Sequence, residues 1–166
     1  MRWLIALLLF FPGTAFAAQL LFAGGQWVAL DRGGSCEAAT RALRIATKGS
    51  VQGRAGFAFD AAGPRHGQFF AQLSRVPRPG STVILTIGDQ PFLLASGSGW
   101  AWSRDPAQES AMIVAARSTG GMRVESRDQT GSRFVDRYLL DGAATAIDAA
   151  AARCAASKLA NSGRNP

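Results

Sequence analysis

Large apolar residues that recur at every second position, in short runs separated by glycine- and proline-rich turns, constrain the fold of this chain most strongly. Phe57 and Phe59 begin the pattern, and residues 69–73 repeat it after a turn at 63–67. A period of two places alternate side chains on opposite faces of an extended strand. The spacing therefore predicts a β-hairpin with one face of each strand turned toward a core.

Further segments carry strand patterns. Residues 82–87 are rich in β-branched side chains, and a short turn separates them from 92–95, which predicts a second hairpin. Residues 122–127 alternate between apolar and polar or charged positions, so one face of that strand should meet water. A returning strand is predicted over 133–140, and 26–30 is the candidate first strand.

A helix is predicted where Asp105, Pro106 and Gln108 occur together. Aspartate is a favoured N-cap, proline suits the first helical position, and a glutamine three residues after the cap can reach back to the backbone. Gly120 and Gly121 then supply a stop.

A second helix is predicted near the C-terminal end, with Asp141 as its cap. Its apolar residues step by four, three, four and three positions, which places them on one helical face. They are Leu140, Ala144, Ile147, Ala151 and Cys154. This register directs Cys154 toward the core.

These elements define an α+β, β-rich class: an antiparallel β-sandwich or partly open barrel with two helices, the second C-terminal. The length suits one domain once the N-terminal segment is set aside. We place this single β-rich domain at 18–156 and expect a disordered polar tail at 157–166.

The first residues have the order of a secretory signal peptide. Arg2 precedes an apolar run at 3–11, Pro12 and Gly13 break that run, and small residues lead to Ala17. The run is shorter than the roughly 20 residues that a membrane-spanning helix needs. We therefore predict a signal peptide over 1–17, cleavage near Ala17, and a periplasmic or secreted protein without a transmembrane anchor.

Cys36 and Cys154 are the only two cysteines. Export to an oxidising compartment makes a disulfide between them the expected state, and it would tie the start of the domain to its end. The chain-entropy model gives so long a loop about 4–5 kcal/mol of stabilisation. The segment 36–47 itself is compatible with either a strand or a helix.

The formal net charge of +7 is carried mainly by arginine, with Lys48 and Lys158 the only lysines. The basic residues are scattered rather than gathered in a stripe with aromatic residues, which argues against nucleic acid as the partner. A GC-rich genome would account for the arginine preference. The alternative is attraction to anionic envelope material such as acidic lipid or polysaccharide.

Trp100 and Trp102 are two positions apart, so an extended chain places both indoles on one face of a strand. Such a pair can form a cluster in the core or on the sheet surface, or a platform on which sugars or bases stack. We expect the first of these.

The sequence contains no complete catalytic or metal-binding motif. His66 is the only histidine, Ser98 lacks the frame of a nucleophile elbow, and zinc and phosphate-loop motifs do not occur. We therefore predict no catalytic, cofactor-binding or metal residues, and the disulfide cysteines are the only assigned positions. Two pairs of carboxylates are interpreted as members of solvated ion pairs rather than glycosidase acids: Asp136 with Asp141, and Glu125 with Asp128.

The last third of the chain has a distinctive order of elements. A helix at 108–117 precedes strands at 122–127 and 134–140, and a Leu-x-Gly turn at 140–142 leads into a helix of small residues. In this order, and in the strand around Trp27, the chain resembles the invasion-associated locus B family of alphaproteobacterial envelope proteins. The resemblance implies an exported β-sandwich-like domain of the periplasm or outer envelope, with no established enzyme activity.

These features together predict an exported, non-enzymatic periplasmic or envelope-associated protein that uses no cofactor. Its expected partner is a protein or an anionic envelope component. The alternative is a small periplasmic hydrolase that acts on envelope material, for which His66 is the only candidate histidine base.

Overall fold

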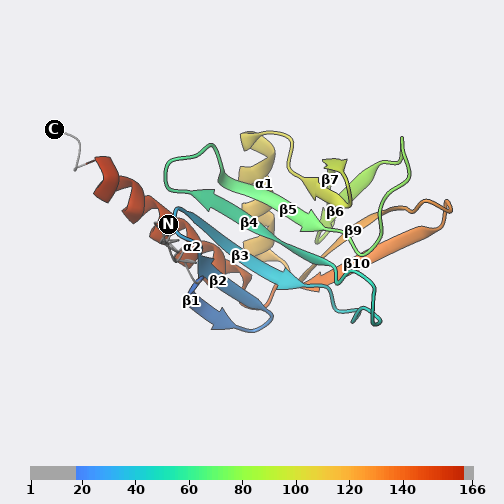
Figure 1. Ribbon diagram of the computed structural model, residues 1–166, viewed down its shortest axis with the longest axis horizontal. Coiled ribbons are helices and arrows are strands. Elements are labelled where there is room, and N and C mark those ends of the chain that lie inside the picture. Colours follow the sequence, from blue (N-terminus) through green and yellow to red (C-terminus); the bar gives the residue numbers. More distant parts are fainter. Residues whose placement is uncertain (1–17, 163–166) are drawn as a thin grey trace, which may run out of the picture.

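The computed structural model describes residues 18–162. In this range ten antiparallel strands form one sheet in the order β1-β2-β3-β4-β5-β8-β7-β6-β9-β10, accompanied by two helices (Figure 1). The strands are β1 (Gln19–Gly24), β2 (Trp27–Asp31), β3 (Ser35–Arg41), β4 (Arg54–Asp60), β5 (His66–Gln72), β6 (Val83–Ile87), β7 (Gln90–Gly97), β8 (Trp100–Trp102), β9 (Gly121–Arg127) and β10 (Arg133–Leu139). The helices are α1 (Pro106–Ser118) and α2 (Ala143–Ser162).

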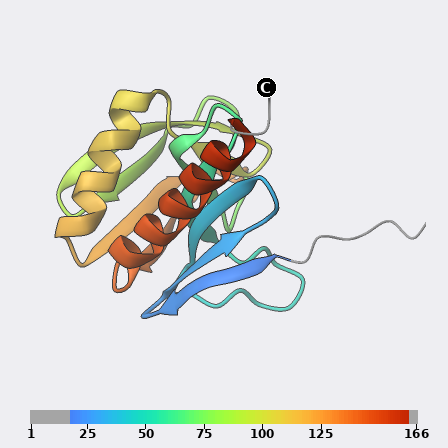
Figure 2. The same cartoon turned by 90° about the vertical axis from the view of Figure 1, so that its left-hand side faces the viewer.

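Both helices lie on the same side of the sheet (Figure 2). α2 packs against β1 to β4, and α1 packs against β5, β6 and β7. Large side chains that belong to the buried core come from both layers: Trp27, Phe57, Phe69, Met112 and Ile147. Because side chains alternate along each strand, the side chains between these core positions point to the other face of β2 to β5 and β8, where most of them are partly buried or exposed.

The sheet curls until its two ends approach each other without pairing. The indole N–H of Trp27 on β2 donates to the carbonyl oxygen of Leu139 on β10 at 2.9 Å. The backbone N–H of Leu43 donates to the carbonyl oxygen of Arg137 at 2.8 Å. The predicted class, a β-rich α+β fold with two helices of which the second is C-terminal, is confirmed, and its sheet is open rather than a closed barrel.

The predicted start of α1 is confirmed. The carboxylate of Asp105 accepts a hydrogen bond from the backbone N–H of Gln108 at 2.8 Å, and the Gln108 side chain accepts one from the backbone N–H of Arg104 at 2.9 Å. Both bonds satisfy donors at a helix start that have no partner within the helix. The three predicted hairpins β4–β5, β6–β7 and β9–β10 are also present.

The N-terminal part of the sheet differs from the prediction. β1 was not predicted: it is an edge strand whose register shifts between Leu20 and Phe22, so its burial does not alternate cleanly. The segment 36–47, whose sequence is compatible with either a strand or a helix, belongs to β3 as far as Arg41 and is a loop beyond it.

The second helix also differs at its ends. It begins at Ala143 after Gly142, whose φ is 87°, and no capping bond from the Asp141 side chain is found within residues 18–162. The carbonyl oxygen of Asp141 accepts a hydrogen bond from Gln26 instead. α2 runs to Ser162, past position 156 where we placed the end of the domain. The predicted signal peptide and its cleavage site lie outside the described residues.

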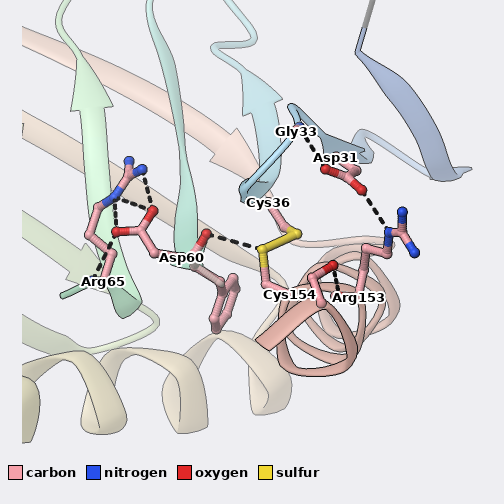
Figure 3. Close-up of a disulfide and its surroundings, with 9 residues drawn as sticks. Asp31, Gly33, Cys36, Asp60, Arg65, Arg153 and Cys154 are labelled. Carbon is pink, nitrogen blue, oxygen red and sulfur yellow. Dashed lines mark hydrogen bonds and ion pairs between the residues drawn. A yellow bond between two sulfur atoms is a disulfide. The ribbon is translucent and has the colours of Figure 1, made fainter. Parts of the chain in front are cut away.

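The predicted disulfide joins Cys36 on β3 to Cys154 on α2 (Figure 3). Their Cα atoms are 5.9 Å apart, and 118 positions separate them in the sequence. Beside the bridge, Arg153 Nε and the backbone N–H of Gly33 donate to the Asp31 carboxylate at 2.6 and 2.8 Å. These hydrogen bonds, that of Arg153 first, lower the pKa of Asp31. The bridge and the ion pair together fix α2 to the first strands.

The turn between β9 and β10 is organised by Asp128. Its carboxylate accepts hydrogen bonds from the Thr130 hydroxyl and from Arg75, each at 2.7 Å, and from the backbone N–H groups of Thr130 and Ser132 at 3.0 Å. These bonds, led by that of the Thr130 hydroxyl, hold the pKa of Asp128 at about 2 instead of 3.8.

We expect Asp128→Asn to weaken the acid dependence of stability. Because the folded-state pKa is depressed, ionised Asp128 contributes its full stabilisation above pH 3.8, and this contribution is lost as the pH falls toward about 2. Urea unfolding at several pH values across this window measures the effect. Asp89→Asn, in the turn between β6 and β7, is the matched control; an Asp128→Asn protein with the acid dependence of wild type would contradict the account.

Candidate functional site

An open groove of about 670 Å³ lies on the sheet face opposite the helices. Its side chains come mainly from β4, β5 and β8, which are neighbours in the sheet. We call it the aromatic groove and define it by Arg54 on β4, Gln68 and Phe70 on β5, and Trp100 and Trp102 on β8.

Small residues form the base of the aromatic groove. Gly56 on β4 lies opposite Phe70 on β5 in the ladder. A Cβ atom at Gly56 would stand 3.0 Å from the Phe70 ring and 2.1 Å from the carbonyl oxygen of Ala38. The absence of a side chain at Gly56 therefore lets the aromatic ring lie over β4.

Three aromatic side chains form the wall of the aromatic groove. Trp102 is exposed, while Trp100 and Phe70 are half-buried. The ring centroids of Phe70 and Trp100 lie 6.5 Å apart. Of the expected places for a Trp100 and Trp102 cluster, the core or the sheet surface, the structure has the sheet surface, because Ala101 between them takes the fully buried position and leaves both indoles on the open face.

Arg54 places a positive charge among these rings. Its guanidinium carbon lies 5.5 Å from the Phe70 ring centroid and 5.2 Å from that of Trp100. Its Nε also donates to the side-chain oxygen of Gln72 at 3.2 Å. Cation–π contacts with two rings and one hydrogen bond hold the guanidinium in place.

The groove presents positive charge to the solvent even though carboxylates lie nearby. Glu37 pairs with Arg32 and lies 3.9 Å from Arg54, and Asp60 pairs with Arg65. The side chains of Arg54 and Arg65 are 38% and 39% exposed, whereas those of Glu37 and Asp60 are only 15% and 11% exposed. A ligand therefore meets guanidinium groups before it meets carboxylates.

Asp60 is held in its charged form. The side chain of Arg65 donates to both carboxylate oxygens of Asp60, and its backbone N–H donates to one of them at 3.2 Å. The side-chain hydrogen bond is the largest cause that lowers the pKa of Asp60. The pair thus fixes the position of the Arg65 guanidinium at the edge of the groove.

A second hollow of about 320 Å³ continues the same sheet face toward β2. Val28, Leu30 and Ala39 line it, and Arg54 and Glu37 line both hollows. The two hollows therefore adjoin each other at Arg54 and Glu37 on the open sheet face.

The residues that sequence reasoning considered for catalysis do not form a catalytic arrangement. His66 is exposed at the start of β5, and Ser98 lies in the turn between β7 and β8 with a φ of 51°. Within residues 18–162, no hydrogen bond or ion pair joins His66 to another side chain. Cys36 and Cys154 are bonded to each other in the disulfide on the helix side of the sheet, so neither is a free thiol.

The carboxylate pairs also have structural partners. Glu125 pairs with Arg133 at 2.7 Å, and Asp128 pairs with Arg75. The ion-pair interpretation is confirmed for these two residues and is wrong for Asp136, which is buried and accepts a hydrogen bond from the backbone N–H of Ser74 at 2.9 Å. It is also wrong for Asp141, whose side chain takes part in no ion pair among residues 18–162.

Sequence reasoning missed Arg54, Gln68 and Phe70 as site residues. The signal was present in part, because Gln68, Phe70 and Gln72 alternate with buried Phe69 and Ala71. On its own, a strand with polar and aromatic residues on one face and apolar residues on the other indicates only that one face meets the core. Whether the other face belongs to a binding site depends on which strands lie beside it.

Within residues 18–162, no group of three or more His, Cys, Asp or Glu side chains is placed to hold a metal ion. No helix in the same range is long and apolar enough to span a membrane. The chain matches no family model, no curated protein and no solved structure.

Proposed function

We propose that this protein is an exported, non-enzymatic binding protein of the periplasm or cell envelope whose aromatic groove binds an acidic polysaccharide. One observation carries the proposal: on the open sheet face the half-buried rings of Phe70 and Trp100 lie against the guanidinium of Arg54, and the exposed ring of Trp102 lines the same groove. The groove thereby favours the anionic envelope component over a protein as the ligand.

The chemistry of an acidic glycan fits each part of this surface. Pyranose rings carry an apolar C–H face that packs on indole and phenyl rings. Uronate carboxylates form charge-assisted hydrogen bonds with guanidinium groups such as those of Arg54 and Arg65. The amide of Gln68 supplies a donor and an acceptor for sugar hydroxyls.

The proposal includes export of the protein and its relation to the invasion-associated locus B family. The N-terminal sequence, the Cys36–Cys154 disulfide and the resemblance to the invasion-associated locus B family support a location in the envelope. An envelope location also favours a polysaccharide over single-stranded nucleic acid, which would use the same combination of aromatic rings and arginine. Mass measurement of the protein recovered from a periplasmic extract tests the cleavage near Ala17.

We expect Trp100→Ala to weaken binding of polygalacturonate about thirtyfold, which corresponds to ~2 kcal/mol for a tryptophan at the centre of a binding surface. Arg54→Gln should weaken binding about tenfold and reduce its dependence on salt, because one guanidinium–carboxylate contact is lost. Isothermal titration calorimetry measures both effects, and dextran serves as the neutral polymer.

Two variants on the helix side serve as controls. Val114→Ala removes an exposed aliphatic side chain from α1, and Arg117→Gln changes the net charge by the same amount as Arg54→Gln. Both should bind polygalacturonate as wild type does. Equal binding of dextran and polygalacturonate, unchanged binding by Trp100→Ala, or a stronger preference for oligothymidylate than for the acidic glycan would overturn the proposal.

A further inference from the structure

A second surface, away from the aromatic groove, has the chemistry of a membrane contact. We propose that the loop between β3 and β4 docks the protein on an anionic lipid bilayer. The surface consists of Leu43, Arg44, Ile45, Lys48 and Val51, which we call the 43–51 patch. In Figure 1 this teal loop projects beyond the ends of the strands it connects.

The aliphatic side chains of the 43–51 patch are exposed. Ile45 is 65% exposed, and Leu43 and Val51 are each 47% exposed. Ile45 and Val51 line the same shallow hollow, so they lie together. Aliphatic side chains at the tip of a projecting loop can enter the boundary between headgroups and acyl chains without disturbing the core.

The charge of this segment selects an anionic partner. No aspartate or glutamate occurs between Glu37 and Asp60, while Arg44 and Lys48 stand between the exposed aliphatic residues. Among residues 18–162, neither Arg44 nor Lys48 takes part in an ion pair. Each basic residue near an anionic membrane adds electrostatic attraction. The two cations and the exposed aliphatic side chains therefore both favour binding to an anionic bilayer.

Several polar backbone groups of the loop already have hydrogen-bond partners, which lowers the cost of bringing the loop into contact with lipid. The Gln52 side chain accepts a hydrogen bond from the N–H of Ala46 at 2.9 Å and donates to the carbonyl oxygens of Ala42 and Arg44 at 3.1 and 3.2 Å. At the tip, the N–H of Ser50 donates to the carbonyl oxygen of Thr47 at 2.9 Å. The aliphatic side chains are therefore displayed by a folded loop.

Membrane docking is independent of the ligand of the aromatic groove. None of the residues that define the groove belongs to the 43–51 patch. The two proposals can consequently fail separately, and Trp100→Ala should bind membranes as wild type does.

The test uses protein isolated from cells that express the full chain, and sedimentation with vesicles. Vesicles of phosphatidylcholine are compared with vesicles containing 30% phosphatidylglycerol. Arg44→Gln combined with Lys48→Gln should reduce partitioning onto the anionic vesicles about thirtyfold, at roughly fivefold per basic residue. Leu43→Ser combined with Ile45→Ser should reduce it about tenfold, because buried aliphatic area is lost.

Matched controls are Arg104→Gln and Val114→Ser, which remove an exposed cation and an exposed aliphatic side chain elsewhere. Both should partition as wild type does. The proposal is overturned if wild type shows no preference for anionic vesicles, or if either double variant partitions as strongly as the controls. Unchanged thermal unfolding of the double variants assigns any loss to the surface itself.

Discussion

Replacing Cys36 and Cys154 by serine should lower the free energy of unfolding by about 4–5 kcal/mol. The bridge spans 118 positions, so it restricts almost the whole domain in the unfolded state. Loss of so much of the net stability of a domain of this size would leave the protein close to unfolding. Urea unfolding of Cys36→Ser/Cys154→Ser beside wild type measures the difference.

Reduction of the wild-type protein supplies the control for the serine variant. Reduced wild type and the double serine variant should unfold at the same urea concentration, because both lack the same cross-link. Arg153→Gln, which removes only the adjacent ion pair with Asp31, should cost far less because the Arg153 side chain is 46% exposed. A double serine variant within about 1 kcal/mol of wild type would show that the bridge contributes little.

Trp27→Ala should be the most destabilising single substitution in the core, at about 3–5 kcal/mol. Trp27 is 1% exposed, and its ring stacks on Phe57 with centroids 6.4 Å apart. Its indole N–H also donates to Leu139, so the side chain holds β2 to β10 across the curled sheet. Thermal and urea unfolding report the loss.

Trp27→Phe separates packing from hydrogen bonding. Phenylalanine retains an aromatic ring but cannot donate to Leu139, so its cost should be smaller than that of alanine, about 1–3 kcal/mol. Leu85→Ala, at a buried position of β6 without such a bond, provides the comparison for cavity formation alone. A Trp27→Ala protein as stable as wild type would contradict the role assigned to this residue.

Local patterns were sufficient to predict much of the fold. The start of α1 is predicted by Asp105, Pro106 and Gln108, which are close together in the sequence. The hairpins are predicted by apolar residues that alternate with other residues on both sides of short turns. The disulfide was also predictable because only two cysteines are present. The helix start and the hairpins depend on residues that are close in the sequence, and two cysteines allow only one pairing.

The order of the strands could not be read in the same way. β8 pairs with β5 and β7, and β6 pairs with β9, so the sheet order depends on contacts between distant segments. β1 was missed because an edge strand is packed on one side only and need not alternate. The open sheet has ends that meet through Trp27 and Leu139, a contact that no local pattern indicates.

The candidate site illustrates the same limit. The spacing of Trp100 and Trp102 showed that they share a face, but alternation alone does not say which face meets the core. The answer lies in Ala101, which is fully buried in the core while the two indoles turn to the opposite face of the sheet. Arg54 and Phe70 become neighbours of Trp100 only through the order β4-β5-β8.

The indole N–H signals in an NMR titration with polygalacturonate test the central claim most directly. Trp100 and Trp102 lie in the aromatic groove, whereas Trp27 is buried on the other face and acts as an internal reference. The account predicts that the Trp100 and Trp102 signals shift together in a saturable way while the Trp27 signal stays in place. Binding without movement of the Trp100 and Trp102 signals, or no binding at all, would contradict it.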